Sequence, residues 1–68
     1  MQNFSKILKE LRNERKLSLK QLVKEIGVSD IAISRWENNL RIPNIEALIK
    51  LAQFFGVSTD FLLGLKDY

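Results

Sequence analysis

Apolar residues recur at helical spacing along the chain, and no stretch alternates apolar and polar residues as a half-buried strand does. The first stretch carries them at positions i, i+3, i+4 and i+7, as Phe4, Ile7, Leu8 and Leu11. Side chains at this spacing share one face of a helix. The pattern therefore predicts an all-α fold, in which each helix buries one apolar stripe.

Capping residues and glycines divide this pattern into five helices. Ser18 is followed three residues later by Gln21, which makes a capping box at the start of the second helix. Gly27 can adopt the left-handed conformation that ends that helix. The other expected boundaries are Ser29 to Asn38-Asn39 for the third helix, a loop over 40–43, Asn44 to Gly56 for the fourth, and Ser58 to about Gly64 for a short fifth.

The same spacing predicts which side chains are buried. A chain of 68 residues buries only about 60% of its unfolded surface, so its stability should be marginal without disulfides or other cross-links. Trp36 is expected in the core beside Ile33 on one face of the third helix. The fourth helix is expected to bury Ile45, Leu48, Ile49, Leu51, Ala52 and Phe55.

Length and composition limit the chemistry. The 68 residues fit one domain, 1–68, and contain no Cys and no His. Disulfides, thiolate or imidazole metal sites, and Cys- or His-dependent catalysis are therefore excluded. The carboxylate pairs Glu10/Glu14 and Glu37/Glu46 have no obvious pocket, so no enzyme, metal, cofactor or small-molecule ligand is expected. No apolar run approaches a membrane helix and no secretory signal is present, so we expect a cytoplasmic protein.

The positive charge is uneven along the chain. The net charge is +3, but residues 1–24 carry seven Lys and Arg against two Glu, and residues 25–68 are net negative. A basic end on a small domain suggests a polyanionic partner. A solvated helix face explains the same charges equally well.

The most informative segment is the helix, glycine turn and helix over residues 19–38. Only Val28 and Ser29 separate Gly27 from the next helix, so the two helices must cross steeply. The crossing leaves one face of the helix over residues 29–38 exposed, and that face carries short polar and charged side chains. Such a helix can enter the major groove of DNA.

This segment resembles the Cro/repressor-type helix-turn-helix family, also called XRE, over about residues 7–64. The resemblance rests on the runs 17–29, 33–38, 41–44, 51–52 and 55–58. It implies a five-helix, lambda-repressor-like DNA-binding domain that acts as a transcriptional regulator, a repressor binding a palindromic operator as a dimer. Three residues depart from the family pattern: Leu19 replaces a frequent Gln, Val23 a frequent Ala, and Asn39 a frequent Gly.

The resemblance also implies roles for individual residues. The positions that match base contacts are Asp30, Ile31, Ser34 and Arg35. A guanidinium can bind guanine in bidentate fashion, although Arg35 can also bind phosphate or form a surface ion pair. Asp30 is equally explained as a helix cap, and Ser34 can act through water. The expected phosphate contacts are Ser18, Leu19, Lys20, Asn38, Asn39 and Arg41, and Arg12 and Glu37 match a structural salt bridge.

Two questions stay open at the level of sequence. The apolar C-terminal end, with Phe54, Phe61, Leu65 and Tyr68, is a candidate homodimer surface, although these residues can also close a small core. A protein-interaction module that kept the fold without binding DNA, such as an antitoxin-like partner, is the second functional hypothesis. The basic first third, Arg35 and Arg41 favour double-stranded DNA, and with it a location at the nucleoid.

Overall fold

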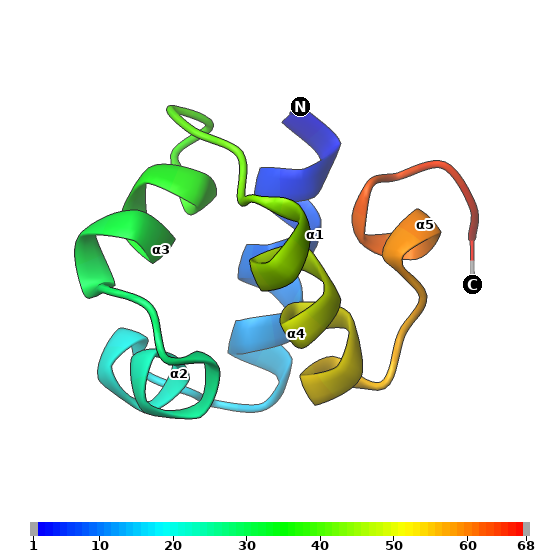
Figure 1. The fold of residues 1–68 in the computed structure, drawn as a ribbon. Helices are drawn as coiled ribbons and strands as arrows, with labels where there is room; N and C mark the ends of the chain where they lie inside the picture. The colour runs from blue at the N-terminus through cyan, green and yellow to red at the C-terminus, as the bar shows by residue number, and fades with distance from the viewer. Residues whose placement is uncertain (1, 68) are drawn as a thin grey trace.

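Five helices form the part of the chain that the structure describes, and no strand occurs in that part. The computed structural model describes residues 2–67. The helices are α1 (Gln2–Glu14), α2 (Leu19–Ile26), α3 (Asp30–Glu37), α4 (Ile45–Phe55) and α5 (Thr59–Leu62). Figure 1 shows α2 and α3 together at one side of the molecule and α5 at the other, with α1 and α4 between them. The predicted all-α, five-helix architecture is confirmed.

The predicted helix ends are present. Ser18 Oγ accepts a hydrogen bond from the Gln21 amide at 3.1 Å, and Gln21 Oε1 accepts one from the Ser18 amide at 2.8 Å. Gly27 ends α2 in the left-handed conformation, with φ 79°. Asn39 adopts the same conformation after α3, with φ 59°, which asparagine tolerates better than most residues.

The end of α1 was not predicted from the sequence. Lys16 has φ 55°, the left-handed conformation that glycine usually supplies. Its amide donates to the Asn13 carbonyl at 3.0 Å, and the Leu17 amide donates to the Arg12 carbonyl at 3.1 Å. These two bonds form a Schellman turn, which directs the chain from α1 into α2.

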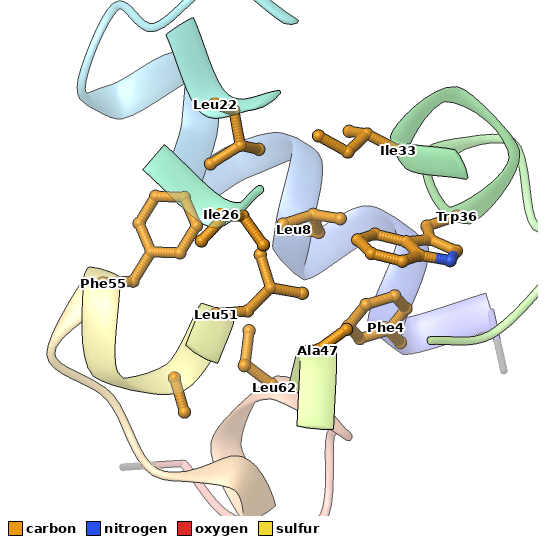
Figure 2. Packing of buried hydrophobic residues seen from close by; sticks show 11 residues of the cluster. Phe4, Leu8, Leu22, Ile26, Ile33, Trp36, Ala47, Leu51, Phe55 and Leu62 are labelled. Carbon is orange, nitrogen blue, oxygen red and sulfur yellow. The ribbon is translucent and has the colours of Figure 1, made fainter. Parts of the chain in front are cut away.

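The core lies where all five helices meet (Figure 2). Phe4 and Leu8 of α1 lie opposite Leu51 of α4, and Leu62 of α5 closes the cluster. The buried apolar residues are Phe4, Leu8, Leu22, Ile26, Ile33, Trp36, Ala47, Leu51, Ala52, Phe55 and Leu62. Trp36 is among them, as its spacing predicted. Within residues 2–67, no helix is long and apolar enough to span a membrane.

The predicted stripe of α4 was wrong at two positions. Ile45 and Ile49 are exposed, at 77% and 44%, whereas Ala47 is buried. Helix α4 is apolar on more than one face, so its periodicity does not determine which face is buried. Packing against α2 and α5 selects the face that carries Ala47, Leu51, Ala52 and Phe55.

Candidate nucleic-acid interface

Helices α2 and α3 form a tight unit that leaves one face of α3 uncovered. The Gly27 amide donates to the Val23 carbonyl at 2.8 Å, which closes α2. Two residues later, Ser29 Oγ accepts from the Ala32 amide at 3.1 Å and begins α3. Ile33 and Trp36 of α3 are buried in the core. The residues on the opposite side of this helix therefore face outward.

The four residues predicted to face bases lie together on that outward face. They line a shallow groove of about 360 Å³ with Leu19 of α2: Asp30, Ile31, Ser34 and Arg35. Ile31 is 59% exposed, so its aliphatic surface is available to a ligand. Within residues 2–67 the Arg35 guanidinium has no ion-pair partner, so its donors are available to a ligand.

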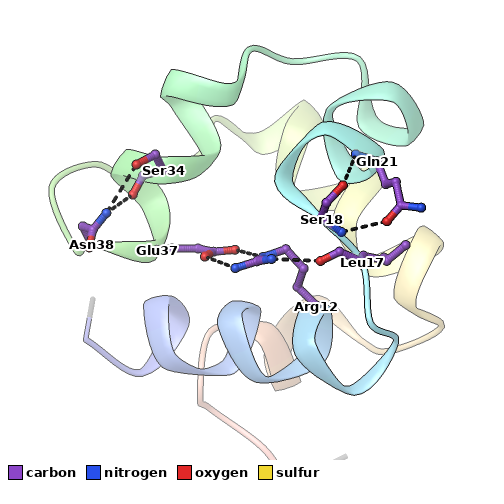
Figure 3. A network of polar contacts seen from close by, with 7 residues as sticks. All are labelled: Arg12, Leu17, Ser18, Gln21, Ser34, Glu37 and Asn38. Atoms are coloured by element: carbon purple, nitrogen blue, oxygen red, sulfur yellow. Dashed lines mark hydrogen bonds and ion pairs between the residues drawn. The ribbon is translucent and has the colours of Figure 1, made fainter.

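The last turn of α3 is closed by Asn38. Its Nδ2 donates to the Ser34 carbonyl at 2.8 Å and lies 3.4 Å from Ser34 Oγ (Figure 3). The Leu40 and Arg41 amides donate to the Arg35 carbonyl at 2.8 and 3.3 Å. Both N–H groups of the exposed Asn38 amide are therefore directed at Ser34 within its own helix, so a contact with an outside donor-seeking ligand requires the longer bond to Ser34 Oγ to break.

The N-terminus of α2 offers two free amides. The capping box engages the amides of Ser18 and Gln21, whereas no described residue accepts from those of Leu19 and Lys20. Unpaired amides and the helix dipole make this end attractive to an anion. Of the predicted phosphate contacts here, Ser18 retains only its hydroxyl proton, and Leu19 and Lys20 retain their amides.

A larger groove lies between α3 and the start of α4, with a volume of about 660 Å³. Three cationic side chains line it, Arg35, Arg41 and Lys50, together with Glu46. The sequence analysis did not select Lys50. The spacing of four residues from Glu46 is typical of a surface ion pair, and the structure does place the two 3.8 Å apart. Only the fold shows that Lys50 also lies beside the exposed face of α3.

The position of α3 depends on Arg12 of α1. Its Nε donates to Glu37 Oε2 at 2.7 Å and its Nη2 to Glu37 Oε1 at 3.0 Å, while Nη1 donates to the Leu17 carbonyl at 2.8 Å (Figure 3). Both side chains are largely buried. The hydrogen bond to Glu37 raises the pKa of Arg12 against the opposing effect of burial. This is the salt bridge that the family resemblance implied.

The C-terminal apolar residues differ in exposure. Leu65 is 71% exposed, whereas Phe54 and Phe61 are half-buried. Phe54 contributes to an anchor between α1 and α4, in which Arg15 donates to the carbonyls of Phe54 and Phe55 at 3.1 and 2.8 Å and lies over both rings. Sequence spacing gave no sign of this contact. Tyr68 lies outside the described residues.

The model of the family described as helix-turn-helix matches residues 8–62. The chain belongs to this helix-turn-helix family. The chain is 40% identical over 61 residues to the HTH-type transcriptional activator BcrR of Enterococcus faecalis, which covers 90% of this chain but only 30% of BcrR. The chain thus spans about half or less of the length of the curated helix-turn-helix relatives that it matches.

Two solved structures share the helix-turn-helix fold. The P22 c2 repressor, solved in complex with a synthetic operator, superposes with a TM-score of 0.88 at 33% identity, covering 97% of this chain and 100% of that one. The N-terminal DNA-binding domain of SinR from Bacillus subtilis gives a TM-score of 0.84 at 31% identity, covering 93% of each chain. The family and the fold that the sequence resemblance implied are therefore confirmed.

Proposed function

We propose that this chain is a sequence-specific DNA-binding domain of a transcriptional regulator, a repressor, and that α3 enters the major groove. One observation carries the proposal: Asp30, Ile31, Ser34 and Arg35 share one exposed groove with Leu19, at the free amide end of α2. Base-reading side chains and a phosphate-binding helix end thus lie on one surface. The operator-bound P22 c2 repressor supports the same reading for a chain of this fold.

The four groove residues have different capacities for reading bases. Arg35 can donate two parallel hydrogen bonds to guanine O6 and N7. Ile31 offers an aliphatic surface to a thymine methyl group. Asp30 can accept from cytosine N4, and it also stabilises the positive N-terminus of its own helix. Ser34 is the shortest of the four and reaches a base through water.

Phosphate contacts hold the domain in register along the duplex. The free Leu19 and Lys20 amides and the Ser18 hydroxyl lie at one end of this surface. Asn38, Asn39 and Arg41 lie at the other, and Lys50 joins Arg41 in the larger groove. All these side chains are exposed except that of Leu19, which is half-buried and contributes its amide.

We further propose that the chain acts as a homodimer on a palindromic operator, in the cytoplasm at the nucleoid. One domain of this size reads only a few base pairs, so two copies on half-sites about 34 Å apart are needed for useful specificity. The C-terminal end with Phe54, Phe61 and Leu65 is the surface that the sequence suggested for pairing. Leu65 is the most exposed of the three.

Binding to bulk duplex DNA across a salt series tests the proposed function. Phosphate contacts release counterions, so log affinity should fall linearly with log salt, by a slope of roughly −0.9 for each contact. Mutation of exposed Lys24, which lines neither groove, to Ala is the matched control and should leave the slope unchanged. An affinity independent of salt would contradict DNA binding and favour a protein-interaction module.

A further inference from the structure

Two polar side chains are buried in the described part of the chain, those of Ser5 and Glu37. Both lie where α1 packs against the C-terminal end of α3. Arg12 accounts for Glu37, but nothing in the apolar core accounts for Ser5. A buried hydroxyl costs free energy unless it is hydrogen-bonded, and alanine would favour the helix more strongly. The hydroxyl of Ser5 therefore needs an explanation outside the core.

The Ser5 hydroxyl is bonded to the end of α3. Its Oγ donates to the Trp36 carbonyl at 2.6 Å, across 31 positions of the chain. That carbonyl lies in the last turn of α3 and has no helical partner, because the Leu40 amide donates to the Arg35 carbonyl instead. The Asn39 amide also donates to the Trp36 carbonyl, at 3.3 Å. Ser5 and Asn39 therefore meet at one oxygen atom, just where α3 ends.

The same hydroxyl lies against the side chain of Asn39. Ser5 Oγ is 3.5 Å from Asn39 Oδ1, so the oxygen end of this amide group faces α1. The contact is long, and it contributes orientation rather than strength. The Asn39 side chain is exposed, and its NH₂ group donates to no described residue. Asn38 instead directs both of its N–H groups at Ser34, so Asn39 is the asparagine of this turn whose donors are free.

We propose that Ser5 is a positioning residue for DNA binding, which holds the turn after α3 so that the Asn39 NH₂ group meets a phosphate. The inference rests on the proposed function. Ser5 itself is buried, and its single proton is engaged by the Trp36 carbonyl, so it acts on DNA through the turn. A contact between an amide group and a phosphate reads no base. The contribution of Ser5 is therefore the same for every DNA sequence.

A double-variant cycle tests this assignment. The probes are two duplexes, one carrying the site enriched from random-sequence DNA and one of unrelated sequence. Ser5→Ala should weaken binding to both by the same factor, roughly two- to tenfold, which corresponds to one hydrogen bond. Asn39→Gly removes the side chain but keeps the left-handed turn, and it should cause a similar or larger loss. The double variant should bind no more weakly than Asn39→Gly alone, because the group that Ser5 positions is then absent.

Ile7→Val is the matched control for stability. Ile7 is half-buried on the same helix and packs against the apolar core. Its shortening should lower the urea midpoint of unfolding and leave both affinities unchanged. All affinities are measured at a temperature where every variant is fully folded, so a change in affinity does not report a loss of folded protein.

The cycle separates positioning from a purely structural role. Unchanged affinity in Ser5→Ala would overturn the assignment, as would an equal loss of affinity in Ile7→Val. A Ser5→Ala loss that persists undiminished beside Asn39→Gly, or that is confined to the enriched site, would place the effect of Ser5 elsewhere on α3. Each of these results leaves the proposed function intact. No binding of the unmodified chain to either duplex would contradict the proposed function and this assignment with it.

Discussion

Arg12 and Glu37 join the first and third helices by two parallel hydrogen bonds, of 2.7 and 3.0 Å, between a guanidinium and a carboxylate that are both largely removed from solvent. The third donor of Arg12 binds the Leu17 carbonyl, one residue before the cap of α2. One side chain therefore holds both α3 and the segment that leads into α2, the two elements that carry the proposed DNA contacts.

Arg12→Met should destabilise the fold by about 3 kcal/mol, because it leaves the Glu37 carboxylate buried without a partner. The double variant Arg12→Met/Glu37→Met should recover much of the loss, since no buried charge remains. Urea denaturation measures both. A single variant within about 0.5 kcal/mol of the unmodified chain would show that the pair is energetically unimportant.

The pH dependence of this contribution has a definite sign. The pKa of Arg12 is raised in the folded chain, so its contribution is fully present below the unfolded pKa and is lost only as pH rises through the folded pKa. Both values lie far above neutrality. The stability difference between the unmodified chain and the double variant Arg12→Met/Glu37→Met, which leaves no buried carboxylate, should therefore be the same at about pH 7 and about pH 9.

Arg15→Lys tests the anchor at the end of α4. A lysine keeps the charge but cannot bond two successive carbonyls in a planar fork or stack equally well on Phe54 and Phe55. We expect a loss of roughly 1–2 kcal/mol in thermal or urea unfolding. Lys9→Ala, on an exposed part of the preceding helix α1, is the control and should change stability by less than about 0.5 kcal/mol.

Lys16→Gly should stabilise the chain by about 0.5 kcal/mol or more. Glycine adopts the left-handed conformation without the steric cost that Lys16 bears at φ 55°. Lys9→Gly, in the interior of α1, should instead cost about 1 kcal/mol. Equal losses in the two variants would contradict the assignment of a strained turn at Lys16.

Arg35 and Lys50 should differ in how their removal affects DNA binding. Arg35→Ala should cost about 1–3 kcal/mol at the preferred site and relax preference at one base pair. Lys50→Ala should weaken binding to all sequences alike and reduce the salt slope by about one. Competition binding to matched and mismatched duplexes measures both. A uniform loss for Arg35→Ala would make it a phosphate contact.

The sequence predicted local structure well because caps and turns depend on neighbouring residues. The Ser18–Gln21 capping box, the end of α2 at Gly27 and the left-handed Asn39 are all fixed within a few residues of chain. The groove that gathers Asp30, Ile31, Ser34 and Arg35 follows from their spacing on one helix, which is why the sequence could group them.

Contacts between residues that are far apart in the chain could not be predicted from the sequence, for a physical reason. Periodicity did not reveal which apolar face of α4 would be buried, so Ile45 and Ile49 were wrongly assigned to the core. The Arg15 contacts with Phe54 and Phe55 join residues about forty positions apart. Lys50 lies in the larger groove only because the fold brings the first half of α4 to the opposite wall of that groove from α3. Each of these depends on tertiary packing rather than on local pattern.

Selection of bound sites from random-sequence duplex DNA tests the central claim most directly, because it reports sequence preference without assuming an operator. The account predicts an enriched half-site, present as an inverted pair spaced by about one helical turn. The Arg35→Ala variant should enrich the same site with one base pair relaxed. A pool that binds without any enriched sequence, or an identical site from the Arg35→Ala variant, would contradict base reading by α3.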